Sequence, residues 1–262
     1  MNDIVMGKYY PINSLIHTLD ARAKLIGALY FTVLLIMAGD HRTYWILALY
    51  TAILITLSKI PILTLLKSIK PLIRIIIFTT LIQMLTSGGG QIYFSFSFIT
   101  ISELGMLRSL SVLIRFLLTI LMLSVISLTT KPLDLTTGLG NIFTPLKLFK
   151  INVDDIALMT SIALRFIPTL QVEFERIVKA QISRGMEFEG LGAFEKMKRT
   201  TPIFLPVFIR SFYKSKELAD ALDARNYRAG DDRTNFRNMT WQIGDTIFLL
   251  SLAALTVFVM AF

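Results

Sequence analysis

The chain has 262 residues, of which 54% are hydrophobic and only 17% charged. This composition is too apolar for an ordinary soluble domain and indicates a membrane protein. The net charge of +9 favours anionic lipid or acidic protein surfaces as partners; the basic residues form no aromatic-lined stripe, so we expect no nucleic acid. The absence of cysteine excludes disulfides, thiolate metal ligands and a cysteine nucleophile.

Charge-poor windows predict five membrane-spanning helices. Four of them lie in a membrane region of residues 1–130, at about 22–39, 43–59, 71–87 and 108–130, and the last covers residues 241–262. With its flanks, each window reaches the roughly 20 residues that cross a bilayer. We therefore predict an all-α membrane protein with about five transmembrane helices.

The distribution of basic residues orients these helices. The connection between the second and third spans contains Lys59, Lys67, Lys70 and Arg74, whereas TSGGGQIYFSFSFITISELG, after the third span, contains no Lys or Arg. The positive-inside rule then places the first connection in the cytoplasm and the second outside. We predict a cytoplasmic amino terminus and an extracellular carboxyl terminus.

Residues 131–240 differ from the rest because they hold 17 Lys/Arg and 13 Asp/Glu, two thirds of all charged residues in the chain. A charge at the bilayer centre costs about 2.5–3.5 kcal/mol, so we predict that this segment lies in the cytoplasm. Its apolar residues recur at spacings of three to five, which predicts long helices packed on each other. We expect Pro168 to kink the first helix, and Pro202 and Pro206 to mark the start of the second or a bend in it.

Catalytic and metal-binding patterns are missing from the sequence. SGGGQIYFS lacks the lysine and the spacing of a phosphate-binding loop, and we interpret it as a flexible external turn. His17 and His41 are too isolated to form a metal site. We predict no catalytic residue, no metal site and no cofactor in this chain. As an alternative function, Arg115 and Asp245 would pair inside the membrane as the site of a stand-alone secondary transporter.

Two predicted helix ends each place an arginine among small residues: Ser183, Arg184 and Gly185 in AQISRG, and Ala224, Arg225 and Asn226 in ADALDARNYR. One interpretation is a pair of ordinary helix ends, since an arginine there complements the helix dipole and Gly or Asn can end the helix in a left-handed conformation. In the other, the small residues let each helix end enter a groove of a partner, where the guanidinium binds a carboxylate. From the residues alone, a membrane scaffold unrelated to transport also stays open.

These two ends resemble the paired Ala-Arg-Gly signatures of the transmembrane (T) component of energy-coupling factor transporters. GKYYPINSLIHTLDARAK resembles the amino-terminal part of that family, and ALRFIPTLQVEFERIVKAQISRG resembles its long coupling helix. Three positions depart from the family pattern. Ser183 replaces Ala, Asn226 replaces Gly, and Ala21 stands where proline is usual.

The resemblance implies a non-catalytic subunit of an importer in a bacterial cell membrane. In that family the T component joins two cytosolic ABC-type ATPases, which bind ATP and Mg, to a small membrane subunit, the S component, which binds a vitamin or metal ion. Arg184 and Arg225 would each dock into one ATPase. Ser183, Gly185, Ala224 and Asn226 would shape the two helix ends, and residues 131–240 would form the coupling region.

Overall fold

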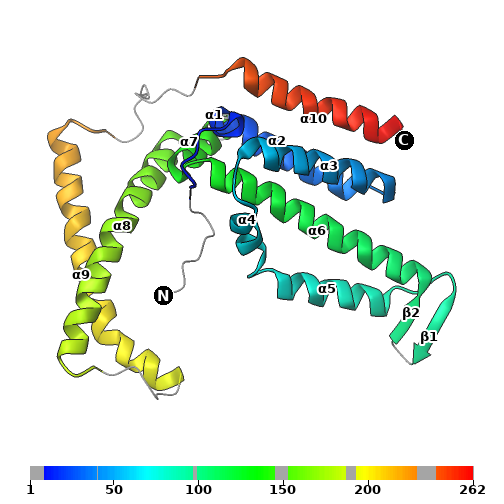
Figure 1. Ribbon diagram of the computed structural model, residues 1–262. Helices are drawn as coiled ribbons and strands as arrows, with labels where there is room; N and C mark the ends of the chain where they lie inside the picture. Colours follow the sequence, from blue (N-terminus) through cyan, green and yellow to red (C-terminus); the bar gives the residue numbers. More distant parts are fainter. Residues whose placement is uncertain are drawn as a thin grey trace. The chain divides into compact units, whose positions relative to one another are not determined.

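The computed structural model describes residues 9–39, 41–96, 99–144, 153–186, 193–228 and 240–261. Contacts divide the chain into two compact units. The first unit comprises Met1–Ile142 and Arg237–Phe262, and the second comprises Phe143–Phe236. Both are helical (Figure 1), which confirms the predicted all-α membrane fold class.

The described elements of the first unit are α1 (Leu15–Thr18), α2 (Ala21–Met37), α3 (His41–Ser58), α4 (Ile62–Ile69), α5 (Ile73–Thr86), β1 (Ile92–Phe96), β2 (Ile99–Ser102), α6 (Glu103–Thr129), α7 (Pro132–Ile142) and α10 (Ile243–Ala261). Those of the second unit are α8 (Val153–Ser183) and α9 (Ala193–Ala224). Helices α2, α3, α5, α6 and α10 occupy the five windows in which we predict membrane spans. The short helices α1, α4 and α7 are additional to that prediction.

Helix α6 is the centre of the first unit, because α2, α3, α4 and α5 all contact it. Its buried side chains Leu118, Met122 and Val125 recur at helical spacing and belong to one cluster with Phe31 and Leu35 of α2. Between helices that face lipid on their outer sides, contacts of this kind stabilise mainly through close van der Waals packing. The packing therefore depends on the shape of these side chains.

Helices α2 and α10 approach each other closely at Gly27. A Cβ atom added to this glycine would clash with the ring of Phe248 in α10. Small residues permit such close approach between membrane helices. A larger residue at position 27 would push the two helices apart.

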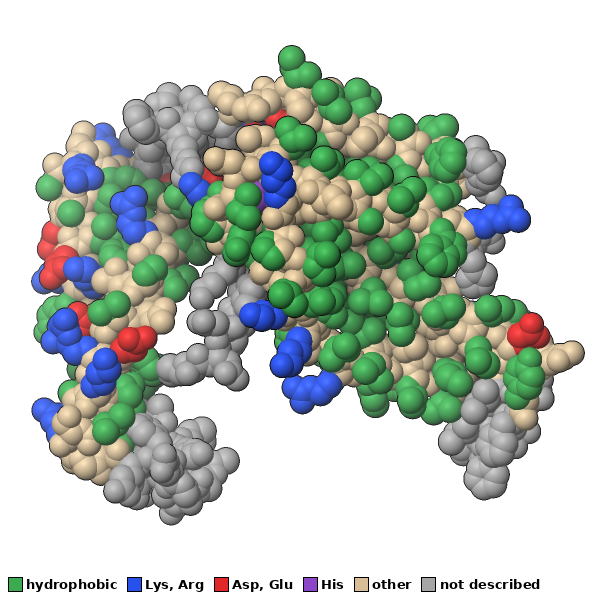
Figure 2. Space-filling model, in the orientation of Figure 1, with side chains coloured by type: hydrophobic (Ala, Val, Ile, Leu, Met, Phe, Trp, Pro, Cys, Tyr) green, Lys and Arg blue, Asp and Glu red, His purple; other side chains and the backbone are tan. Residues whose placement is uncertain are grey.

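The outer surface of the first unit is apolar. Large side chains such as Leu29, Trp45 and Phe78 are exposed by 72%, 78% and 64%, and Figure 2 shows hydrophobic side chains over much of this surface. Apolar exposure on this scale marks a surface that another apolar phase covers. By length and composition α6 and α10 can cross a membrane, and α3 and α5 are shorter apolar helices.

The segment after α5 contains a β-hairpin that we did not predict. The glycine-rich stretch forms a turn, with Gly89 and Gly90 at φ of +132° and +71°. Strands β1 and β2 then pair antiparallel, with Phe96 opposite Ile99. A bulge lies between Ile92 and Phe94. The alternation of aromatic and polar residues in IYFSF is the sequence signal for this strand.

Helices α8 and α9 of the second unit pair antiparallel. Near their middles, Arg210 of α9 lies 3.7 Å from a carboxylate oxygen of Glu173 in α8. Farther along, the hydroxyl of Tyr227, after α9, donates to Oδ1 of Asp155 at the start of α8 at 3.3 Å. From Glu173 back to Asp155 is 18 positions, and from Arg210 forward to Tyr227 is 17. The two contacts therefore define an antiparallel register over about 26 Å of helix.

The prolines of this unit lie inside the helices. Helix α8 runs through Pro168 without interruption, and α9 begins at Ala193, so Pro202 and Pro206 do not mark its start. The stretch Asp155–Ser183 also qualifies as a span by length and composition, although it is less apolar than α6. Hydropathy alone therefore does not exclude α8 from the membrane, and its cytoplasmic position stays a prediction.

Candidate functional site

The end of α8 has a defined backbone geometry. The N–H of Gly185 donates to the carbonyl of Ile182 at 2.9 Å, and the N–H of Met186 donates to the carbonyl of Gln181 at 3.1 Å. These two hydrogen bonds define the Schellman motif, which satisfies carbonyls that a helix leaves free at its end. The motif requires a left-handed residue, and Gly185 has a φ of +87°.

The end of α9 repeats this geometry. The N–H of Asn226 donates to the carbonyl of Asp223 at 2.9 Å, and the N–H of Tyr227 donates to that of Leu222 at 3.0 Å. Asn226 has a φ of +55°, which confirms the left-handed conformation considered for it. Asparagine is the most common substitute for glycine at this position. The replacement of glycine by Asn226 therefore leaves the helix end intact.

The two arginines occupy the same position, immediately before the left-handed residue. Arg184 and Arg225 are both exposed, and among the described residues neither has an ion-pair partner. The neighbouring Ser183 and Ala224 are exposed as well. The hydroxyl of Ser183 donates to the carbonyl of Lys179 at 3.1 Å, so it turns back along its own helix. Each guanidinium is thus left as the charged group at a slim helix end.

The structure does not bring the two arginines together. Because α8 and α9 are antiparallel, their carboxyl-terminal ends lie at opposite ends of the pair, as Figure 1 shows for this unit. Arg184 lies 11 residues beyond Glu173, and Arg225 lies 15 residues beyond Arg210, which corresponds to about 16 and 22 Å of helix on opposite sides of that contact. The two arginines therefore cannot act together in a single site.

Helix α9 also carries an exposed aromatic stripe. The side chains of Phe204, Phe208 and Phe212 are spaced four residues apart and exposed by 60–68%. The rings of Phe204 and Phe208 are stacked with centroids 6.4 Å apart. Their spacing of four residues places them on one face of the helix. Their exposure leaves this apolar face open for a partner.

Arg115 and Asp245, the pair considered for a stand-alone transporter, do not meet. Arg115 donates from Nη2 to the hydroxyl of Tyr44 at 2.8 Å and to the carbonyl of Ala38 at 3.4 Å, after the carboxyl-terminal end of α2. The carboxylate of Asp245 accepts from the N–H of Asp20, at the opposite end of α2. A 17-residue helix, about 25 Å long, separates the two sites.

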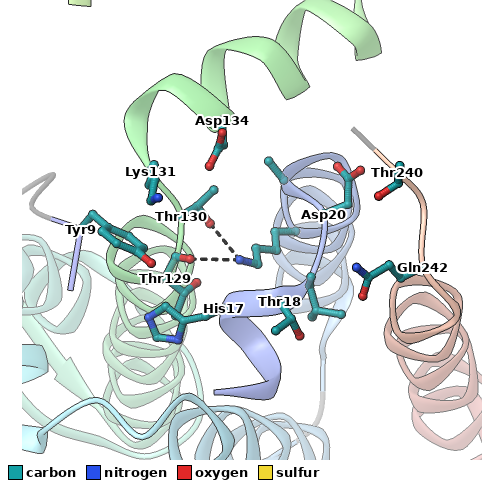
Figure 3. A pocket seen from close by; sticks show the side chains of 13 residues that line it. Tyr9, His17, Thr18, Asp20, Thr129, Thr130, Lys131, Asp134, Thr240 and Gln242 are labelled. Atoms are coloured by element: carbon teal, nitrogen blue, oxygen red, sulfur yellow. Dashed lines mark hydrogen bonds between the residues drawn. The ribbon is translucent and has the colours of Figure 1, made fainter. Parts of the chain in front are cut away.

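A polar cavity of about 330 Å³ lies among α1, α2, the end of α6 and the segment before α10 (Figure 3). Lys24 is one of the residues that line this cavity, and it is only 1% exposed. Its Nζ donates to the carbonyl of Thr129 at 3.1 Å and to the hydroxyl of Thr130 at 3.2 Å. Lys24 therefore joins α2 to the end of α6. Its signal in the sequence is a lysine within the first turn of a predicted span.

His17 also lines this cavity, where its ring nitrogens take part in hydrogen bonds. Its Nε2 donates to the carbonyl of Tyr10 at 2.9 Å, and its Nδ1 lies 2.7 Å from the hydroxyl of Ser14. Within the described ranges, no three His, Asp or Glu side chains are grouped so that they could hold a metal ion. The polar groups of the cavity mainly connect helices.

Comparison with known proteins identifies the family. Residues 12–236 match the family described as Cobalt transport protein (CbiQ). The chain is 44% identical over 253 residues to the energy-coupling factor transporter transmembrane protein EcfT 1 of Listeria monocytogenes, covering 97% of this chain and 95% of the relative. It is 38% identical to the EcfT proteins of Bacillus subtilis, over 97% of this chain and 96% of the relative, and of Lactococcus lactis, over 98% and 97%.

These matches extend over nearly the whole chain, including both arginine-bearing ends and the apolar helices of the first unit. They agree with the resemblance found in the sequence motifs. The chain therefore belongs to the family of transmembrane (T) components of energy-coupling factor transporters, and is a multi-pass membrane subunit of a transporter.

Proposed function

We propose that this chain couples ATP hydrolysis by two partner ABC-type ATPases to the reorientation of an S component that imports a vitamin or metal ion. ATP and Mg bind to the ATPases, and this chain holds no cofactor. The observation that carries the proposal is the pair of exposed arginines, each at the end of a helix with the same Schellman geometry. One chain thus presents the same charged helix end twice, as two similar ATPases require.

Each helix end fits an acidic groove for a physical reason. A guanidinium forms two parallel hydrogen bonds to a carboxylate, and the small residues Ser183, Gly185 and Ala224 add little bulk around it. The Schellman motif fixes the backbone of each helix end, so less backbone conformational entropy is lost on docking. Asn226 supplies the left-handed conformation at the second end.

The antiparallel helix pair provides the mechanical link. When ATP binding closes the ATPase pair, the two grooves approach each other and draw the ends of α8 and α9 with them. Since α8 and α9 contact each other along their middles, a movement of their ends changes the angle at which the two helices cross. The S component would sense this change on the face that carries Phe204, Phe208 and Phe212. Coupling requires that the helix ends bind the closed and open ATPase pairs with different affinity.

Charge reversal of each arginine tests this function. We expect Arg184→Glu and Arg225→Glu each to abolish ATP-driven uptake, and the double variant to co-purify with at least about tenfold less ATPase, because the carboxylate of the groove would face another carboxylate. Arg165→Glu and Lys216→Glu are the matched controls, since both residues are exposed on the same helices and lie more than two turns before the helix ends. Normal uptake by both arginine variants would contradict the proposal.

A further inference from the structure

Helix α4, between α3 and α5, has two different faces. Leu65 and Ile69 are buried, and α4 contacts α6. Ile62 and Leu63, by contrast, are exposed by 68% and 72%. With eight residues and a length of about 12 Å, α4 is too short to cross a bilayer. It is a connecting helix with one apolar face that the described residues leave uncovered.

Basic residues surround this uncovered face. Lys59, Lys67, Lys70 and Arg74 are all exposed, and none has an ion-pair partner among the described residues. Residues 43–102 contain no Asp or Glu, so no carboxylate close in the chain neutralises them. Figure 2 shows Lys and Arg side chains gathered beside hydrophobic ones where Figure 1 places α4 and the start of α5.

We propose that this face binds the anionic headgroups of membrane lipids. The α4 basic surface consists of Lys59, Ile62, Leu63, Lys67, Lys70 and Arg74. A short helix with exposed aliphatic side chains beside unpaired cations lies in the headgroup region, where the aliphatic groups reach the acyl chains and the cations meet phosphates. Each basic residue near an anionic surface strengthens binding about fivefold.

The neighbouring helices favour lipid over an acidic protein as the occupant. Helices α3 and α5, which flank α4 in the chain, are apolar and have widely exposed outer faces, so α4 lies at the boundary of the region that lipid covers. An acidic protein would neutralise the cations but would leave no reason for Ile62 and Leu63 to be exposed beside them. The inference rests on the membrane position of α3 and α5, and not on the proposed ATPase contact.

Lipid quenching tests the α4 basic surface. The full-length chain has no cysteine, so Leu63→Cys takes a single fluorophore without background labelling. In nanodiscs, we expect brominated phosphatidylglycerol to reach half-maximal quenching at a mole fraction about fivefold lower than brominated phosphatidylcholine. Raising the salt concentration should reduce this preference, because salt screens exposed charges. This measurement needs no further variant, so it does not depend on how a variant folds.

Two variants in the Leu63→Cys background complete the test. A fourfold variant should make the two lipids quench equally; it carries Gln in place of Lys59, Lys67, Lys70 and Arg74. The control Arg42→Gln/Arg108→Gln removes two other exposed cations of the same unit and should keep the preference. The proposal is overturned by equal quenching in the chain with all its cations, by a preference that survives the fourfold replacement, or by the absence of quenching from either lipid. The last outcome would mean that protein or water covers the face.

Discussion

The carboxylate of Asp245 accepts a hydrogen bond of 2.7 Å from the backbone N–H of Asp20, 225 positions away in the chain. Its second oxygen accepts one of 2.7 Å from the N–H of Gln242, just before α10. Asp20 is the N-cap of α2, so one buried side chain satisfies backbone donors at the starts of both helices. Helices α2 and α10 therefore start side by side. Farther along, the hydroxyls of Tyr30 and Thr256 lie 3.1 Å apart, so the two helices run in the same direction, as the predicted five spans would require.

Removal of this carboxylate should destabilise the first unit. Asp245→Ala deletes two hydrogen bonds to a charged group, each worth about 1.5–3 kcal/mol, and removes the acceptor of the N–H groups of Asp20 and Gln242. We expect thermal unfolding in detergent at a temperature several degrees lower, with Asp245→Asn between this variant and the original chain. Asp220→Ala, an exposed position on α9, is the control. An unchanged unfolding temperature for Asp245→Ala would show that the carboxylate does not join the helices.

The pKa of His17 predicts a loss of stability in mild acid. Burial lowers this pKa from its usual 6.5; the hydrogen bond to the Tyr10 carbonyl opposes the change, and the charge of Lys24 adds to it. Because the folded chain has the lower pKa, the unfolded chain binds the proton more readily. The stability from neutral His17 is complete above pH 6.5 and is lost as the pH falls through the folded-state pKa.

The corresponding measurement compares unfolding temperatures at about pH 7.5 and pH 5. We expect a larger fall in the original chain than in His17→Gln, which cannot take up a proton. Equal falls in the two proteins would mean that other groups cause the acid sensitivity. Ser14→Ala removes the hydroxyl at Nδ1 and should lower stability at both pH values.

The helices and their ends could be predicted because their signals are local. A charge-poor window identifies a buried or lipid-facing helix wherever it packs, and Gly185 and Asn226 follow helical stretches directly. Helix α4 was not predicted as a separate helix, because its apolar residues continue into those of α5. The hairpin was missed because glycine and serine dominate the composition around it, although IYFSF alternates as a strand should.

The roles of the buried charges could not be predicted, because their partners are far away in the chain. Lys24 meets Thr129, 105 positions later, and Asp245 meets a backbone N–H rather than a side chain. Charge alone suggested Arg115 as a partner of Asp245, but no sequence pattern reports which backbone donor a carboxylate accepts from. These contacts depend on how the helices pack, and the packing depends on many residues at once.

The two helix ends should respond differently to substitution. Gly185→Ala places a side chain at φ +87°, where L-residues are strained by about 1–2 kcal/mol, although no atom of the described residues lies within 4 Å of the added Cβ. We expect faster hydrogen exchange at the end of α8 and weaker ATPase co-purification, with unchanged unfolding of the first unit. Asn226→Gly supplies the residue that fits this conformation best and should change neither property. Equal exchange in both variants would contradict a role for the left-handed cap.

Cysteine accessibility decides the orientation of the chain. The sequence contains no cysteine, so each introduced one reports alone. In intact cells, a membrane-impermeant maleimide should label Gln91→Cys and Phe262→Cys, because we predict the hairpin and the carboxyl terminus outside. Lys198→Cys and Lys216→Cys should react only after the membrane is opened. The reverse pattern would invert the predicted topology.

The same assay locates the first half of α8, which hydropathy admits to the membrane although its later residues are charged. Met159 is exposed by 67%, so a cysteine there meets either water or lipid. If α8 is a cytoplasmic helix, Met159→Cys should react in opened cells as fast as Lys216→Cys. Protection of Met159→Cys in detergent-free membranes, with full reaction after detergent is added, would place this half of α8 in the bilayer. The ATPase contact at Arg184 would then be made by a helix that emerges from the membrane.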